Sequence, residues 1–539
     1  MAEYTAHSLP PIQAYRAPRP SWRAIGLLWL PSLLLSASIL LPVLYLVLRA
    51  GQGQTTLWDL VFRPRNLEIV WNSLLLAFSV TAASIGIALP LAWLTTRTDL
   101  PFRRGWALLT ALPLVIPSYI GAYLFVSAMG PRGIVQGWLE IWFGIERLPS
   151  LYGFPGALYV LTVLTYPYIL MNLRAALAGM DPAIEEAARS LGHTPWQTFW
   201  RVTLPQLRPA LLAGSLLVIL YTLRDFGAVA ILRYDTFTRA IYVQYQSALD
   251  RSAAAALALI LIVITLIVLG IEMRWQTSAR QYSSSSRVRP PTILTLGRWK
   301  WPALIFCGGI TLAALILPAL NLGYWLVRGV QAGEAISSLW GASWNSFSIS
   351  LIAALVTVAA SLPISILRVR RAGKVPQVLE RIMYVGFALP GIVIALALVF
   401  FGANYLPWLY QTAPMLIFAY VILFLPQALG AVQASLMTVH PNLEEAGRSL
   451  GKGPLAVFRR ITLPLVRPGL GAGTALIFLT VMKELPATLI LSPIGFKTLA
   501  TSVWGAVSEA FFAQAAAPAL LLILVSSVPM AFLTIRKQI

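Results

Sequence analysis

The chain has 539 residues, of which 58% are hydrophobic and only 11% are charged, and its mean hydropathy is +0.76. A soluble domain carries about 25% charged residues, so this composition excludes a soluble protein and predicts an integral membrane protein. The net charge of +21 would suit nucleic acid, but membrane topology accounts for it and no nucleic-acid partner is expected. The single cysteine, Cys307, excludes a disulfide framework and a cysteine-based metal site.

Apolar stretches long enough to cross about 30 Å of hydrocarbon follow one another along the chain. The twelve predicted helical spans are residues 25–48, 70–96, 105–128, 153–173, 207–232, 252–271, 302–327, 344–367, 382–403, 413–434, 467–491 and 513–535. The first apolar run is longer than the core of a cleavable signal peptide, so we expect it to remain as a span.

The polar segments between the spans predict the domain organisation and the orientation. Residues 1–24 are expected to form a cytoplasmic tail, and the Ser- and Arg-rich residues 274–300 a cytoplasmic linker between two transmembrane units, 25–273 and 301–539. With the N-terminus inside, the cytoplasmic segments hold 28 of the 40 basic residues and 9 of the 19 acidic residues. This excess predicts that both termini lie in the cytoplasm.

The two units repeat each other. Residues 181–209 and 440–468 are identical at 16 of 29 positions when aligned without a gap, and both fall on the cytoplasmic side. Trp-Asn-Ser also opens the second and the eighth span, at 71–73 and 344–346. Because six spans are an even number, the units enter the membrane in the same direction. We therefore predict an all-α integral membrane protein with about 12 transmembrane helices arranged as two parallel six-helix repeats.

Each repeated loop is predicted to contain a short helix that ends at a glycine. Acidic residues stand in its first turn, where the helix dipole favours them, and Gly192 and Gly451 follow its last residues. A helix with small residues on one face suits insertion into a groove of a partner. An amphipathic connector lying on lipid headgroups fits the same pattern.

The loops also carry a family motif. Glu-Ala-Ala, three residues, Gly, nine residues, an aliphatic residue, one residue and Leu-Pro resembles the signature of the inner-membrane permeases of ATP-binding-cassette (ABC) importers. Residues Glu186–Pro205 match it fully, and Glu445–Pro464 match it except that Gly447 replaces the second alanine. The resemblance covers both units and implies a type I importer permease of the fused kind in a bacterial inner (plasma) membrane.

In that family the loop forms a coupling helix that seats in a groove of an ATP-binding subunit. The resemblance therefore implies coupling loops at 181–205 and 440–464. The coupling residues that we expect are Glu185, Glu186, Ala187, Ala188, Gly192, Leu204, Pro205, Glu444, Glu445, Ala446, Gly447, Gly451, Leu463 and Pro464.

The expected partners follow from a motif that the chain lacks. No GxxxxGK[ST] phosphate-binding loop occurs, so ATP and Mg²⁺ are expected to bind two separate ATP-binding subunits, and this chain is predicted to be neither an enzyme nor a holder of a cofactor. The resemblance adds a periplasmic substrate-binding protein as a third partner, besides the lipid membrane.

Four charged residues fall inside predicted spans, where charge is costly and often functional. They are Arg224 and Asp225 in the fifth span and Lys483 and Glu484 in the eleventh. Adjacent residues do not face each other on a helix, so we expect pairs across the two units: Arg224 with Glu484, and Lys483 with Asp225. Such pairs could latch an outer gate, or they could only hold the units together.

The substrate is suggested by resemblance alone. Residues 222–242 and 481–504 resemble the ferric iron permeases most closely, which implies ferric iron delivered by a periplasmic binding protein. The three histidines, His7, His193 and His440, lie on the tail and on cytoplasmic loops, and no metal site is predicted. The alternatives are an ABC permease for thiamine or phosphonate, an ion-gradient-driven carrier of 6+6 spans, and a membrane scaffold that uses the loops only for docking.

Overall fold

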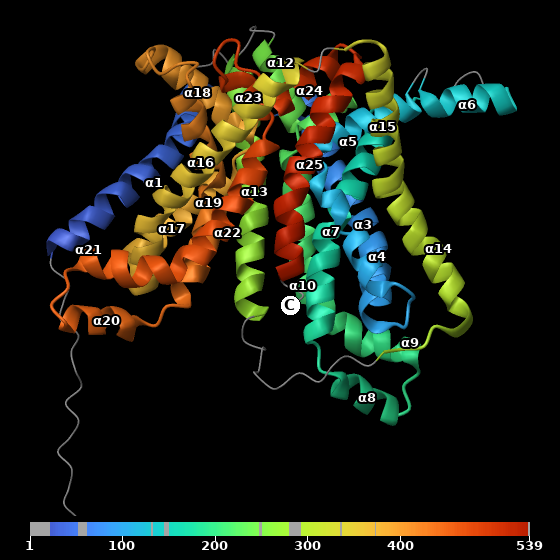
Figure 1. Ribbon diagram of the computed structural model, residues 1–539, viewed down its shortest axis with the longest axis horizontal. Helices are drawn as coiled ribbons and strands as arrows, with labels where there is room; N and C mark the ends of the chain where they lie inside the picture. Colours follow the sequence, from blue (N-terminus) through green and yellow to red (C-terminus); the bar gives the residue numbers. More distant parts are fainter. Residues whose placement is uncertain are drawn as a thin grey trace, which may run out of the picture.

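The computed structural model describes residues 22–51, 62–130, 133–144, 150–246, 251–279, 293–334, 337–371 and 373–536. The expected tail therefore lies almost wholly outside the described residues, and so does the middle of the expected linker. Every described segment of substantial length is helical, in agreement with the predicted all-α class (Figure 1).

The first unit contains α1 (Trp22–Gly51), α3 (Pro64–Arg97), α4 (Arg103–Leu109), η1 (Leu112–Val115), α5 (Ser118–Met129), α6 (Ile134–Phe143), α7 (Phe154–Gly179), α8 (Pro182–Ser190), α9 (Pro195–Thr198), η2 (Phe199–Thr203), α10 (Leu204–Arg224), α11 (Gly227–Ile231), α12 (Phe237–Gln246) and α13 (Arg251–Ala279). The helix η1 is a 3₁₀ helix and η2 is a π-helix.

The second unit contains η4 (Gly297–Trp299), α14 (Lys300–Thr311), η5 (Leu312–Ile316), α15 (Leu317–Gln331), α16 (Ser337–Arg370), α17 (Lys374–Ala388), α18 (Gly391–Tyr405), α19 (Ala413–Met437), α20 (Pro441–Ser449), α21 (Pro454–Val457), η6 (Phe458–Thr462), α22 (Leu463–Met482), α23 (Pro486–Leu491), α24 (Leu499–Ser508) and α25 (Phe512–Arg536). Here η4 is a 3₁₀ helix, whereas η5 and η6 are π-helices.

Each of the twelve predicted spans has a helical counterpart. Within the described residues, 9 helices are long and apolar enough to cross a membrane, and two bent pairs of helices raise the number to 11. The twelfth predicted span corresponds to α25, within which Phe512–Ser527 forms a shorter apolar helix. The predicted architecture of about twelve spans in two repeats is thus confirmed in its main features.

The third and the ninth predicted spans are bent sharply at a break between helices. Residues 105–128 are divided among α4, η1 and α5, with a bend of 96° before α5, and residues 382–403 are divided between α17 and α18, with a bend of 98°. A proline stands at each break, Pro117 and Pro390. Proline has no amide hydrogen and forces the preceding residue into an extended conformation, and the residues before them, Ile116 and Leu389, are extended.

The two units exchange their first helices. The helix α1 packs against α16, α17 and α18 of the second unit, whereas α15 packs against α5 of the first unit. The amide of Asn321 on α15 donates to the Leu124 carbonyl at 2.6 Å and lies 2.9 Å from the Ser127 hydroxyl. The buried apolar residues form one large cluster that includes both units, so the repeats share a single core.

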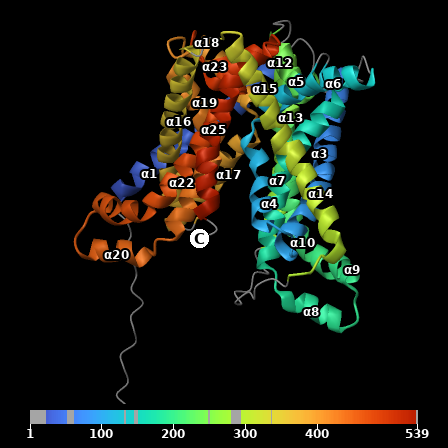
Figure 2. The ribbon, with the colours of Figure 1, turned by 45° about the vertical axis from the view of Figure 1, so that its right-hand side comes forward.

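The repeated loops lie at one end of the bundle. The helices α8 and α20 stand at this end, while α6, α12, α18 and α24 lie at the opposite end (Figures 1 and 2). Both views show the halves closest together at the end of α12 and α24 and diverging towards α8 and α20. By the predicted topology, the diverging end is cytoplasmic.

Candidate functional site

The two predicted coupling loops, residues 181–205 and 440–464, fold alike. The helices α8 and α20 begin with a proline, whose missing amide costs nothing at a helix start. The Asp181 carboxylate accepts a hydrogen bond from the Ala183 amide at 3.0 Å, and His440 Nδ1 accepts one from the Asn442 amide at 3.3 Å. Each residue thus caps the amides at the start of its helix.

Both helices end in a glycine with left-handed backbone geometry. Gly192 has φ +91° and Gly451 has φ +76°. In the first loop, the amide of His193 donates to the Ala188 carbonyl at 3.2 Å, and Lys452 donates to Gly447 in the same way in the second. This is the Schellman arrangement, which favours glycine because it carries no Cβ.

Each loop exposes three apolar side chains at matching positions. Such side chains would be buried against a partner or lipid in a functioning assembly, since apolar area on a surface favours burial. Leu191 is 83% exposed and Leu450 is 80% exposed. The full sets are Ile184, Leu191 and Trp196 in the first loop and Leu443, Leu450 and Leu455 in the second.

The two adjacent glutamates of each loop point in different directions, which the sequence did not indicate. Glu186 and Glu445 are exposed, whereas Glu185 and Glu444 are buried. Glu186 and Glu445 belong to the Glu-Ala-Ala motif and stand on the face that a partner could reach. Glu185 and Glu444, which we predicted as coupling residues of the same kind, face the bundle instead.

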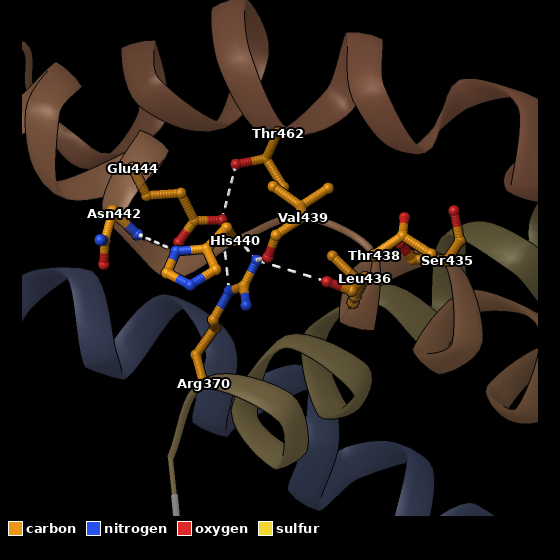
Figure 3. A network of polar contacts seen from close by, with 9 residues as sticks. All are labelled: Arg370, Ser435, Leu436, Thr438, Val439, His440, Asn442, Glu444 and Thr462. Atoms are coloured by element: carbon orange, nitrogen blue, oxygen red, sulfur yellow. Dashed lines mark hydrogen bonds and ion pairs between the residues drawn. The ribbon is translucent and has the colours of Figure 1, made fainter. Parts of the chain in front are cut away.

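The buried glutamate of the second loop joins three segments (Figure 3). Arg370, in the last turn of α16, donates to Glu444 Oε1 from Nη2 at 3.1 Å and from Nε at 3.3 Å. The Thr462 hydroxyl donates to the same oxygen at 2.9 Å. Arg370 Nη2 also donates to the carbonyls of Val439 at 3.0 Å and Leu436 at 3.4 Å.

The first loop brings the same residue types together, but there Arg97 forms an ion pair and no hydrogen bond within the described residues. The Thr203 hydroxyl donates to Glu185 Oε1 at 2.9 Å, and Arg97 Nη1 lies 3.6 Å from Glu185 Oε2. Arg97 is only 1% exposed. Sequence reasoning missed both arginines. The signal was present, because each is a basic residue at the end of the second span of its unit, 273 positions apart.

The departure of the second loop from the family motif has a steric explanation. A Cβ atom on Gly447 would lie 2.5 Å from Ile461 Cδ1 and 3.2 Å from Val457 Cγ2. In the first loop, Ala188 occupies this position and the smaller Val202 stands where Ile461 does. The methyl group lost at Gly447 is therefore matched by the methylene gained at Ile461.

The Leu-Pro pair of the motif shapes the entry into the next span. Pro205 and Pro464 have no amide hydrogen to continue the helical ladder. The preceding segments are π-helical in both loops, and the Leu204 and Leu463 amides donate to the carbonyls of Phe199 and Phe458, five residues back. Single-turn π segments of this kind often occur at functional sites.

The charged residues of the fifth and eleventh spans lie at helix breaks. We expected continuous helices over 207–232 and 467–491, but α10 ends at Arg224 and α22 ends at Met482. The Asp225 carboxylate accepts a hydrogen bond from the Ala228 amide at 3.0 Å, and Glu484 accepts one from Ala487 at 3.2 Å. Each carboxylate thus satisfies an amide at the start of the short helix that follows.

The two predicted charge pairs remain predictions, and their members meet different surroundings in the structure. Arg224 and Glu484, which come from different units, lie close enough to attract each other. Lys483 instead donates from Nζ to the Leu114 carbonyl of η1 at 3.4 Å, and no ion pair joins it to Asp225 among the described residues. The break before Pro117 supplies that carbonyl, since the ladder of hydrogen bonds stops there.

The carboxylates also meet the breaks of the third and ninth spans. A Cβ atom on Gly391, the first residue of α18, would lie 2.3 Å from Glu484 Oε1. At the equivalent place in the first unit stands Ser118, which lies near the Asp225 carboxylate. The longer glutamate side chain, Glu484, thus faces Gly391, and the shorter aspartate side chain, Asp225, faces Ser118. Within the described residues, no group of three or more His, Cys, Asp and Glu could hold a metal ion.

We predict that Gly447→Ala destabilises the second coupling loop by up to about 1 kcal/mol, because overpacking against Ile461 and Val457 outweighs the gain in helix propensity that alanine brings. The double change Gly447→Ala with Ile461→Val should recover most of this loss. Thermal unfolding of the purified chain in detergent measures both effects. The control is Gly430→Ala inside α19, where the added Cβ meets no atom within 4 Å. Equal midpoints for Gly447→Ala and the unchanged chain would show that the steric explanation is wrong.

Comparisons with known proteins agree with this geometry. The family described as "Binding-protein-dependent transport system inner membrane component" matches residues 84–274 and 361–537. The Fe(3+)-transport system permease protein FbpB 2 of Haemophilus influenzae is 36% identical over 508 residues, which cover 93% of this chain and 97% of the relative. The ferric transport system permease protein FbpB of Actinobacillus pleuropneumoniae is 26% identical and covers 79% of this chain and 64% of the relative.

A relative with a different name matches a shorter part of the chain. The molybdenum transport system permease protein ModB of Escherichia coli is 35% identical over 165 residues, which cover 29% of this chain and 69% of ModB. The two segments that match the family together make up more than half of the chain, and each contains one coupling loop. This protein therefore belongs to the family of inner-membrane components of binding-protein-dependent transport systems, the permeases of ABC importers.

Proposed function

We propose that this permease imports ferric iron, that a soluble binding protein delivers the iron, and that two ATP-binding subunits seat on its two coupling loops. The observation that carries the energy coupling is the duplicated exposed face of the loops, with three apolar side chains at matching positions. The proposal of ferric iron as the substrate rests on the 36% identity to an Fe(3+)-transport permease over 93% of the chain.

The geometry supports a mechanism of alternating access. The halves diverge on the side of the coupling loops and meet at the opposite end (Figures 1 and 2), where Phe226 of the first unit contacts Trp504 of the second. ATP binding would draw the partner subunits together and carry α8 and α20 inward. Closure at this end would then open the contact at the other end, so that the cargo enters from the binding protein.

The lack of a metal cluster within the described residues is compatible with this role. Fe³⁺ is a hard cation that prefers oxygen ligands gathered in one place. In a binding-protein-dependent system, however, the soluble protein can select the cargo. The membrane pathway then needs only to accept it weakly, with Asp225, Glu484, Arg224 and Lys483 as the charged groups nearest to the breaks in the spans.

The test of the function is uptake into vesicles that contain the full chain, its ATP-binding subunits and its binding protein. We expect ⁵⁵Fe³⁺ to accumulate only when ATP is supplied to the ATP-binding subunits and only when the iron-loaded binding protein is present. Transport of thiamine, phosphonate or molybdate in preference to iron would overturn the proposal that iron is the substrate. Uptake driven by a proton or sodium gradient without the ATP-binding subunits would instead indicate an ion-gradient-driven carrier.

We predict that Glu186→Ala combined with Glu445→Ala uncouples the transporter. Both side chains are exposed on the loop face that the ATP-binding subunits would contact. Uptake should fall at least tenfold while ATP hydrolysis persists and the chain remains in the membrane. The control is Glu140→Ala on α6, an exposed acidic residue at the opposite end of the bundle. Undiminished uptake by the double variant would refute the coupling role of these residues.

We also predict that Arg224 and Glu484 act as a pair. Arg224→Gln and Glu484→Gln should each slow ATP-dependent uptake severalfold, because each leaves a charge unpaired between the units. The double variant should lose much less than the product of the two single losses. As a comparison, Lys483→Gln and Asp225→Asn, between which no ion pair is found among the described residues, should show less coupling than Arg224 with Glu484. Independent losses for Arg224 and Glu484 as well would contradict the pairing.

A further inference from the structure

We propose that Arg97 and Arg370 are positioning residues that fasten the coupling loops to α3 and α16, so that these helices carry loop motion to the outer end of the bundle. We use the name loop brace for Arg370, Glu444 and Thr462 in the second unit and for Arg97, Glu185 and Thr203 in the first. The inference rests on the proposed function, because it names the residues that transmit the movement of the ATP-binding subunits to the spans.

The first argument is the burial of charge. The side chains of Arg370 and Glu444 are only 17% and 11% exposed, and those of Arg97 and Glu185 only 1% and 8%. A buried charge that loses its partner is strongly destabilising. The short helix α20 therefore cannot move away from the end of α16 without a large cost. A displacement of the loop must instead be passed on to the span.

The second argument is that one carboxylate oxygen joins several segments. Glu444 Oε1 accepts from Arg370 at the end of α16 and from Thr462 in the π-helix η6, which leads into α22 (Figure 3). Arg370 also binds the carbonyls of Leu436 and Val439 at the end of α19. Three spans thus meet at one ion pair directly beneath the loop. The loop brace of the first unit joins α3, α8 and η2 through Glu185.

The third argument lies at the far ends of the same two helices. The hydroxyl of Ser346, near the start of α16, accepts a hydrogen bond from the Leu499 amide at 2.7 Å, where α24 begins. Ser73, near the start of α3, accepts one from the Phe237 amide at 3.1 Å, where α12 begins. These serines belong to the repeated Trp-Asn-Ser motif, which the coupling mechanism alone does not explain.

Each of the two helices is therefore held at both ends. The helix α16 has 34 residues, and it connects the second coupling loop to α24. The ring of Trp504 on α24 packs against Phe226 of the other unit with ring centroids 5.1 Å apart. A movement of the loop can thus reach the contact that closes the outer end through α16, a continuous helix that includes Pro363 and is fixed at the loop brace and at Ser346.

The test compares Arg370→Gln with Arg368→Gln in vesicles that contain the complete transporter. Arg368 stands in the same last turn of α16, but it pairs with Glu380 at 2.7 Å. We expect Arg370→Gln to lower the amount of cargo transported per ATP hydrolysed at least tenfold, and Arg97→Gln to act in the same direction. Arg368→Gln should stay within twofold of the unchanged protein. Loss of folded protein alone would lower transport and hydrolysis together and leave this ratio intact.

The conservative variant Arg370→Lys should restore part of the ratio, because a charge remains beside Glu444. Thr462→Val, which removes one hydrogen bond at nearly constant volume, provides the same readouts should Arg370→Gln fail to fold. A ratio within twofold of the unchanged protein for both Arg370→Gln and Thr462→Val would overturn the proposal.

A second measurement separates this proposal from the proposed function. Spin labels on Leu450→Cys and Val375→Cys report the distance between the loop and the cytoplasmic end of α17 in the full chain alone. Both positions are exposed, whereas the native Cys307 is buried and should not label. We expect the distance distribution to become at least twice as wide in Arg370→Gln and to keep its width in Arg368→Gln. An unchanged width of the distance distribution in Arg370→Gln would overturn the proposal of the loop brace. An absence of iron uptake by the unchanged protein would overturn only the proposed function.

Discussion

A carboxylate buried beneath each coupling loop is the interaction on which the rest of this structure depends. Glu185 and Glu444 lie on short helices that bury only a few residues and whose exposed faces carry apolar side chains. Taking a carboxylate out of water is tolerable only beside a cation and hydrogen-bond donors. The cations are Arg97 and Arg370, and the hydroxyl donors are Thr203 and Thr462. These contacts hold the loops against the spans.

The membrane imposes the second constraint, which concerns backbone groups. In hydrocarbon every amide and carbonyl must find a partner inside the protein. The proline breaks at 117 and 390 and the breaks after Arg224 and Met482 leave such groups free. Asp225 and Glu484 satisfy amides at these breaks, and Lys483 satisfies the carbonyl of Leu114. The charged residues of the spans are therefore explained first as caps for broken helices, and a gating role builds on that position.

Fusion and exchange of helices make one molecule of the two repeats. The helices α1 and α15 pack across the units, and Asn321 binds the backbone of α5. A further link joins the end of the linker to the first unit. Asp99 accepts from the Leu296 amide at 2.8 Å and pairs with Lys300 at 2.9 Å. Hydrogen bonding to the Leu296 amide and to Lys300 lowers the pKa of Asp99 below its ordinary value.

The sequence by itself determined the membrane class, the number and order of the spans, the parallel repeat and the position of both coupling loops. These features depend on local apolar length, on charge in short loops and on residue spacing, all of which are present along the chain. Proline at 117 and 390 could also have predicted the two sharp bends. The effect of Pro205 and Pro464 on the loops was visible in the same way.

Only the tertiary structure decided which of two adjacent glutamates turns inward and which cations they meet. Glu185 and Glu186 are chemically alike, and the choice between them depends on an arginine almost ninety positions away. Lys483 likewise donates to the Leu114 carbonyl, which a helix break in the other unit exposes, and not to the expected Asp225. Partners of this kind come from segments that are distant in the chain, so their distances are set by packing and not by spacing in the sequence.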